Sequence, residues 1–303
     1  MPELPEVKLY LHALRPRVVG ETIERLRIRS PSLLKTWDPP VSEVHGKVVR
    51  GLSRLGKRVV FGLDDDLFAV VHLMISGRFQ WRDAGAAIPR KRGHAAFDFG
   101  HGSLLLTEAS SHKRASLHLV RGREALRDHD PGGIEPLEAG PDEFAAAIRR
   151  ENRTLKRALT DARILSGIGN AHSDEILLRA RLSPVQLTSR LTDEEVERLR
   201  SAARASLTEW SERLIEEAGE DFPTKVTAFH PAMSAHGKYG EPCDQCGTAI
   251  QRIVYATRET NYCPTCQTGG KLLADRALSR LLRRDWPRRL EDLESRRQPP
   301  GGG

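Results

Sequence analysis

The sequence predicts an α+β protein whose β and α parts follow one another along the chain. Strand-like segments fill much of the first third, helical spacing dominates the middle third, and all four cysteines lie between residues 243 and 266. With 303 residues, the chain is long enough for two domains. Because no apolar run approaches the roughly 20 residues of a membrane span, we do not expect a membrane protein.

The first third is expected to be mostly β. Within residues 24–81, VVRGLSRLGKRVVFGL and LFAVVHLMISGRFQW are rich in Val, Ile, Leu and Phe, and the three aspartates at 64–66 predict a turn between them. Farther along, AAFDF and SLLLT flank Gly-His-Gly at 100–102, which predicts a hairpin.

The middle third is expected to be helical. It follows DHDPGGIEPLEAGPD, whose many prolines and glycines indicate a linker. In TDEEVERLRSAARASLTEWSERLIEEAG, Thr192 and Glu195 form a predicted capping box, and Gly219 is a plausible helix end. One face of this helix carries the apolar side chains Leu199, Ala203, Leu207, Trp210 and Leu214.

Charge favours an anionic partner without demanding one. The net charge is +7 and the isoelectric point is near 9.4. However, residues 268–303 contain nine Lys/Arg against five Asp/Glu, so much of the excess lies in the tail. The start, MPELPEVKLY, lacks the features of a signal peptide, and we expect a cytoplasmic protein.

The four cysteines indicate a metal site. They form two CxxC pairs, Cys243/Cys246 and Cys263/Cys266, joined by 16 residues that suit a β-hairpin. Four thiolates select one tetrahedral zinc and leave no position open for catalysis, so the ion would be structural. Two redox-active pairs are the alternative.

The amino terminus offers unusual chemistry. Methionine is commonly removed before proline, and removal of Met1 would leave Pro2 with a free secondary amine. An α-amino group has a pKa of roughly 8, so more of it is neutral at pH 7 than of a lysine, and it can attack a sugar carbon to form an iminium ion. Glu3 and Glu6 are nearby acids or bases. Most chains that begin this way carry out no such reaction.

A glycine-rich turn lies within the helical region, in LSGIGNAHSDEILLRARLSP. Its glycines would let the backbone approach a phosphate, and Asn170 could donate a hydrogen bond to the same group. An ordinary corner between two helices explains the segment equally well.

Together these segments resemble the formamidopyrimidine-DNA glycosylase/endonuclease VIII family. The matches are MPELPEV, Lys57 in LGKRVVFGL, GIGNAHSDEIL at 167–177, the cysteine pairs and Arg258 between them, in the family's order over roughly residues 1–267. The resemblance implies an N-terminal β-sandwich, a helix–two-turn–helix domain and a zinc-stabilised β-hairpin, with DNA between the domains. The implied boundaries are 1–127, a linker at 128–141, 142–236, a zinc finger at 237–267, and a basic extension at 268–303.

The resemblance also implies a function. The chain would be a monomeric, bifunctional DNA glycosylase and AP lyase of base excision repair, which excises an oxidised base and cleaves the abasic site. Pro2 would be the nucleophile, Glu3 the proton donor, and Lys57 would assist β-elimination. Asn170 and Arg258 would hold phosphates, with Arg258 linked to δ-elimination. Alternatives are a non-catalytic binder of damaged DNA, or mainly an abasic-site lyase.

Several positions depart from the family pattern. In HLMISGRF, Ile75 stands where the family has a methionine that fills the space of the flipped base. The family's Phe-bearing loop is replaced by TEASSHKRASLHL, where Lys113 or Arg114 could stand in for its arginine. His94 occupies a position at which the family often contacts DNA, although a buried or solvated strand histidine is equally compatible.

The lesion and the extension stay open. Oxidised purines and oxidised pyrimidines are rival substrates. In the extension, KLLADRALSRLLRRDW has leucines at helical spacing with interleaved arginines. It would be either a basic helix that binds DNA or a helix that docks on the protein.

Overall fold

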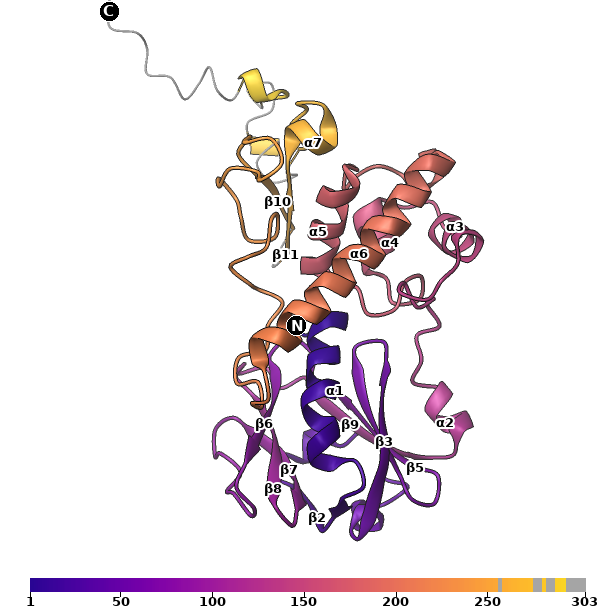
Figure 1. Ribbon diagram of the computed structural model, residues 1–303, viewed down its shortest axis with the longest axis vertical. Coiled ribbons are helices and arrows are strands. Elements are labelled where there is room, and N and C mark those ends of the chain that lie inside the picture. The colour runs from indigo at the N-terminus through magenta and orange to yellow at the C-terminus, as the bar shows by residue number, and fades with distance from the viewer. Residues whose placement is uncertain (256–257, 275–279, 282–286, 293–303) are drawn as a thin grey trace, which may run out of the picture. The chain divides into compact units, whose positions relative to one another are not determined.

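The chain forms two compact units (Figure 1). The computed structural model describes residues 1–255, 258–274, 280–281 and 287–292. The two units comprise Met1–Gly133 with Leu207–Ala228, and Ile134–Ser206 with the described residues after Ala228. The division differs from the boundaries predicted from sequence, because residues 207–228 group with the N-terminal region.

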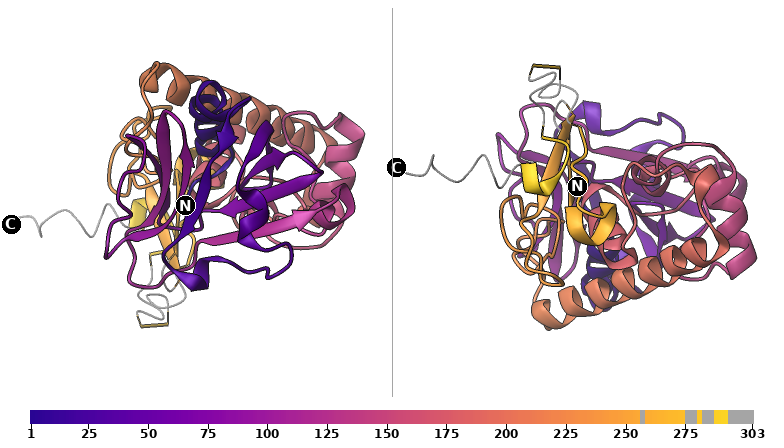
Figure 2. Two further views of the ribbon diagram at one scale, coloured as in Figure 1. Left: turned by 90° about the horizontal axis from the view of Figure 1, so that it is seen from below. Right: turned by 90° about the horizontal axis from the view of Figure 1, so that it is seen from above.

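Two antiparallel sheets form the first unit (Figure 2, indigo to purple). The five-stranded sheet has the order β1 (Thr22–Ile23), β3 (Lys47–Leu55), β4 (Arg58–Leu63), β5 (Leu67–His72) and β9 (Ser116–Arg121). The four-stranded sheet has the order β2 (Arg25–Ile28), β7 (Gly93–Phe99), β8 (Gly102–Glu108) and β6 (Gly77–Arg82). Phe61 of one sheet stacks on Phe97 of the other, with ring centroids 5.3 Å apart. The predicted β-sandwich is confirmed.

The predicted turns have clear local causes. Between β4 and β5, Asp65 and Asp66 adopt φ angles of +56° and +53°, a left-handed conformation that aspartate tolerates better than most residues. Phe99 pairs with Gly102, which closes the expected β7–β8 hairpin.

The expectation of strands throughout residues 24–81 is wrong in one stretch. Two short 3₁₀ helices, Pro31–Leu33 and Val41–Val44, interrupt it. Prolines at positions 31, 39 and 40 lack backbone N–H groups and cannot donate to a sheet, which explains the interruption.

Helix α1 (Leu4–Val18) is absent from the sequence-based expectations. Its first turn is closed by a capping box between Glu3 and Glu6. It packs on β3 and β4 and buries side chains around most of its circumference: Leu4, Val7, Leu9, Tyr10, Leu11, Leu14 and Val18. A helix buried in this way shows no single apolar stripe, so spacing does not reveal it.

The second unit contains the predicted helices, namely α3 (Pro141–Arg149), α4 (Leu155–Thr160), α5 (Asn170–Ala180) and the first half of α6 (Asp193–Ala218). The predicted capping box of α6 is confirmed, because Glu195 N–H donates to Thr192 Oγ1 at 3.2 Å and Thr192 N–H donates back to Glu195 Oε2 at 3.1 Å. The helix ends before Gly219, whose φ angle is +56°.

Only parts of the C-terminal extension are described. Positions 276, 278, 282, 283 and 284 of its expected helix lie outside the described residues. Leu273 is buried with Ile253 and Tyr262 and donates its backbone N–H to the Tyr262 hydroxyl at 2.8 Å. This part therefore docks on its own unit. Among the residues that the structure describes, we find no helix with the length and apolarity of a membrane span.

Two half-buried histidines should make the fold sensitive to acid. Burial is the largest cause that lowers the pKa of His72 to about 4 and of His118 to about 4, and the charge of Arg58 acts in the same direction. The unfolded chain therefore takes up these protons near pH 6.5, whereas the folded chain does so only near pH 4. Stability is fully present above pH 6.5 and is lost as the pH falls towards 4.

We expect the free energy of unfolding to decrease between pH 6.5 and 4, by at most about 1.4 kcal/mol per pH unit for each of these histidines. Urea titrations across this range should show a shallower slope in the His72→Gln/His118→Gln double variant. His101→Gln changes an exposed histidine and is the control. A double variant with the wild-type slope would contradict the assignment.

Candidate active site

The amino terminus lies in a buried, charged cluster of the first unit. Burial is the largest cause that lowers the pKa of the Met1 α-amino group. The carboxylates of Glu3 and Glu6 oppose this shift, whereas the charges of Arg78 and Lys57 add to it. A lowered pKa leaves more of an amine in the neutral form that attacks electrophiles. The sequence predicted Glu3 and Lys57 for this site but missed Arg78.

Each of the two glutamate side chains accepts a hydrogen bond from the backbone N–H of the other. Glu3 N–H donates to Glu6 Oε2 at 2.7 Å, and the Glu3 side chain accepts the Glu6 N–H in return. Both residues are buried, with 3% and 1% of their surface exposed. The start of α1 therefore fixes two carboxylates beside the terminal amine, where the helix dipole also favours negative charge.

Lys57 lies in a two-residue hairpin loop. Leu55 pairs with Arg58, so only Gly56 and Lys57 connect β3 to β4. Gly56 has a φ angle of +59°, which a residue with a side chain adopts at a cost. The tight turn limits where the half-buried Lys57 can reach.

Ile75 is displayed by a constrained loop, residues 73–76 between β5 and β6. Gly77 N–H donates to Leu73 O at 2.9 Å, and a Cβ on Gly77 would lie 2.2 Å from that oxygen. The loop can close only on glycine. Ile75 itself is 57% exposed, so its apolar side chain is accessible for the insertion that the sequence predicts.

His94 is buried, which favours the core alternative over a DNA contact. Only 1% of its surface is exposed, and its Nε2 lies 3.0 Å from Glu108 Oε2. Burial lowers the pKa of this imidazole although Glu108 opposes the shift. The ladder between β7 and β8 shifts register between Gly93 and Ala95, so strand alternation alone does not place His94, and its contact with Glu108 does.

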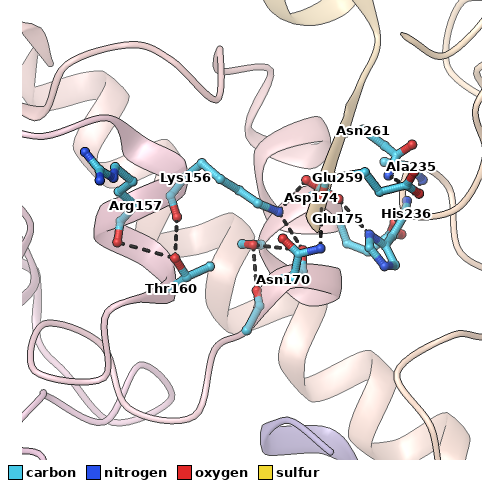
Figure 3. Close-up of polar contacts among 12 residues, drawn as sticks. Lys156, Arg157, Thr160, Asn170, Asp174, Glu175, Ala235, His236, Glu259 and Asn261 are labelled. Carbon is cyan, nitrogen blue, oxygen red and sulfur yellow. Dashed lines mark hydrogen bonds and ion pairs between the residues drawn. The ribbon is translucent and has the colours of Figure 1, made fainter. Parts of the chain in front are cut away.

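In the second unit, Asn170 and Arg258 come from distant segments and lie close together. Asn170 begins α5, and its Nδ2 donates to the backbone oxygen of Glu259 at 2.9 Å (Figure 3). Arg258, the preceding residue, begins β11 and is exposed. The start of a helix, where the helix dipole favours an anion, and a guanidinium suit a phosphate. Gly167, with a φ angle of +80°, shapes the turn that leads into this helix.

A buried ionic network that sequence reasoning missed supports α5 (Figure 3). Asp174 accepts from Lys156 Nζ at 2.5 Å and contacts His236 Nδ1 at 2.7 Å. Glu175 accepts the backbone N–H groups of residues 234–236 at 2.8–2.9 Å. The adjacent acidic pair within GIGNAHSDEIL was the available signal, since such residues are seldom buried without partners.

The four cysteines converge as predicted. Cys243, Cys246, Cys263 and Cys266 place their sulfur atoms within 4.8 Å of one another. The intervening chain forms the expected hairpin of β10 (Gln251–Tyr255) and β11 (Arg258–Tyr262), followed by α7 (Pro264–Thr268). The donor set fits one tetrahedral zinc with a purely structural role. It would hold the end of the hairpin that leads back to Arg258.

This arrangement defines a class of helix–two-turn–helix proteins that carry a zinc finger. Three family models match in succession: the formamidopyrimidine-DNA glycosylase N-terminal domain at residues 1–128, its H2TH domain at 133–213, and a zinc finger found in FPG and IleRS at 240–269. The chain belongs to the formamidopyrimidine-DNA glycosylase family.

Known glycosylases are similar to this chain over most of its length. A formamidopyrimidine-DNA glycosylase of Geobacillus kaustophilus is 34% identical over 280 residues, covering 88% of this chain and all of the relative. One from Desulfitobacterium hafniense is 31% identical with the same coverage. The Lactococcus lactis enzyme bound to DNA with an abasic site has a TM-score of 0.77 and 27% identity, covering 88% of this chain and 99% of its own.

Removing one metal ligand should separate the zinc site from the rest of the molecule. We expect Cys246→Ala to lose zinc and DNA binding together, while the sandwich stays folded because its core lies in the other unit. Elemental analysis, DNA-binding titration and circular dichroism measure the three properties. Asp244→Asn, between the first two ligands, is the control. Active wild-type protein without zinc would end the claim.

Proposed function

We propose that the chain excises oxidised bases and then cleaves the resulting abasic site through a covalent intermediate on Pro2. As a member of its family it is a DNA glycosylase of base excision repair, and AP lyase activity is typical of that family. The observation that carries the proposal is the buried amino terminus, where burial lowers the pKa of the Met1 α-amino group beside Glu3 and Lys57 and would act in the same way on the Pro2 amine that removal of Met1 exposes. We propose that the protein acts in the cytoplasm, at the nucleoid.

The first step requires a free nitrogen on Pro2. While Met1 is attached, this nitrogen belongs to an amide and is not nucleophilic. After removal of Met1, the secondary amine attacks C1′ of the damaged nucleotide, and the bond between C1′ and the base breaks. The base leaves with the bonding electrons and takes up a proton. The amine loses its proton on attack, which balances the proton that the departing nucleobase takes up, and protonation of the ring oxygen by Glu3 then opens the sugar to an iminium ion.

The second step cleaves the strand. The iminium ion acidifies the C2′ proton, and its loss expels the 3′ phosphate by β-elimination. Lys57, which the hairpin loop holds near the terminal amine, stabilises the departing phosphate. Asn170 and Arg258 would hold the flanking phosphates, and Arg258 would assist δ-elimination.

A non-catalytic binder of damaged DNA with this fold is the rival function. Binding alone gives no reason for a buried amine flanked by a lysine, an arginine and two carboxylates, because burial lowers the pKa of the amine and an amine that is charged less often attracts phosphate less. The cluster therefore supports the enzyme.

Altering the terminal amine should abolish covalent capture of abasic DNA. We expect borohydride to trap a protein–DNA adduct with the wild-type chain, and Pro2→Gly to reduce trapping strongly. A chain with one extra residue before Pro2 should behave likewise, because the nitrogen becomes an amide. Pro5→Ala keeps the amine and is the control. Normal trapping with a blocked amino terminus would move the nucleophile to a lysine, Lys57 first.

Lesion choice should be broad. The loop around residues 109–115 lacks phenylalanine, and Ile75 is the exposed apolar side chain beside it. Since each lost base contact is worth roughly 1–3 kcal/mol of discrimination, we expect opposite-base ratios within about tenfold and strong abasic-site cleavage. Single-turnover excision of one oxidised purine and one oxidised pyrimidine, each opposite all four bases, measures this. Rejection of one opposite base by a hundredfold would show that Lys113 or Arg114 restores the missing contact.

A further inference from the structure

A buried carboxylate joins the two loops that carry the departures from the family pattern. Glu108 ends β8 and is fully buried. Its Oε2 accepts the backbone N–H groups of Arg114 at 2.9 Å and Ala115 at 3.2 Å. Its Oε1 accepts from Ser76 Oγ at 3.3 Å. One side chain thus contacts the loop of Ile75 and the far end of the loop at residues 109–115.

The sheet puts Glu108 at the base of both loops. It pairs directly with Gly77 across β6 and β8, and Gly77 is the residue on which the loop of Ile75 closes. Lys113 adds a further bond, because its Nζ donates to the backbone oxygen of Glu108 at 2.6 Å. The backbone of Glu108 therefore contacts the Ile75 loop and the 109–115 loop, and its carboxylate contacts the same two loops.

His94 supplies a further hydrogen-bond donor to this carboxylate. A buried, ionised carboxylate needs several donors, and His94 Nε2 provides one at 3.0 Å. His94 Nδ1 has no hydrogen-bond partner in the described part of the chain. A protonated ring would bury an unpaired N–H at that atom, so the neutral ring with its hydrogen on Nε2 fits best. Both oxygens of Glu108 then accept hydrogen bonds from backbone and side-chain donors.

We propose that Glu108 is a positioning residue for lesion recognition: it holds the Ile75 loop and the 109–115 loop in one fixed relation, so that both enter the duplex together. The inference rests on the proposed glycosylase function and names what orders its damage-reading loops. A short, stiff isoleucine can fill the space of a flipped base only if its backbone is held still, and charge-assisted hydrogen bonds do so in a buried site.

Base excision should depend on Glu108 more strongly than strand cleavage does. Excision requires the damaged base to leave the stack, which costs a few kcal/mol and depends on the inserted loops. An abasic site has no base to expel. Loss of Glu108 should therefore impair excision much more than cleavage of a preformed abasic site.

The test compares E108Q with D98N in the full-length zinc protein. Glutamine keeps the size of Glu108 but replaces one acceptor oxygen with an NH2 donor. Asp98 is a buried carboxylate on β7 of the same sheet that bonds Arg27 and Ser103 and neither loop. Single-turnover rates are measured on an oxidised base and on a preformed abasic site.

For E108Q we expect excision to fall about tenfold or more while abasic-site cleavage stays within about threefold. D98N should leave the ratio of the two rates at the wild-type value, and E108D should recover part of the lost excision. An unchanged ratio in folded, zinc-loaded E108Q would overturn the inference.

Should E108Q fail to fold, Ser76→Ala removes only the bond to the Ile75 loop, and its excision rate should fall about threefold relative to cleavage. A wild-type ratio in that variant would overturn the inference as well. Failure of the proposed function looks different, since the wild-type protein would then cleave neither substrate.

Discussion

The reciprocal hydrogen bonds between Glu3 and Glu6 are the constraint on which the candidate active site depends. They close the first turn of α1, because the Glu6 carboxylate reaches back to the Glu3 N–H and the Glu3 side chain accepts the Glu6 N–H. Because α1 is buried along its length, the terminus cannot swing away from the sandwich. The amine is consequently kept in a poorly hydrated place where burial lowers its pKa. A terminal amine that would be mobile on most chains is thereby fixed, with its pKa shifted towards the neutral form.

The sandwich supplies the other groups through its turns. Gly56 permits the two-residue loop that carries Lys57, and Gly77 permits the closed loop that carries Ile75. Each of these side chains is one or two residues from a paired strand. The loops therefore have little conformational entropy to lose when DNA binds. In the second unit, the contact between Asn170 and the backbone beside Arg258 has the same effect on two phosphate-binding candidates.

Local rules explain what could be predicted from the sequence. The capping box and glycine end of α6, the turn at residues 64–66 and the cysteine hairpin depend on neighbours in the chain, and each is confirmed. Helix α1 escaped prediction because its burial on most sides removes the periodic signal. The pair of His94 and Glu108 joins two strands across the sheet, and no local pattern contains it. Arg78 belongs to the site only because the fold brings β6 to the amino terminus.

In the proposed mechanism, the nitrogen of Pro2 forms the covalent bond to DNA. The most direct measurement is mass spectrometry of the peptide that stays attached to abasic DNA after borohydride reduction and proteolysis. We expect a peptide that begins at Pro2, lacks Met1 and carries the reduced sugar on its terminal nitrogen. An attached peptide that contains Lys57 with a modified side chain, or one that retains Met1, would contradict it.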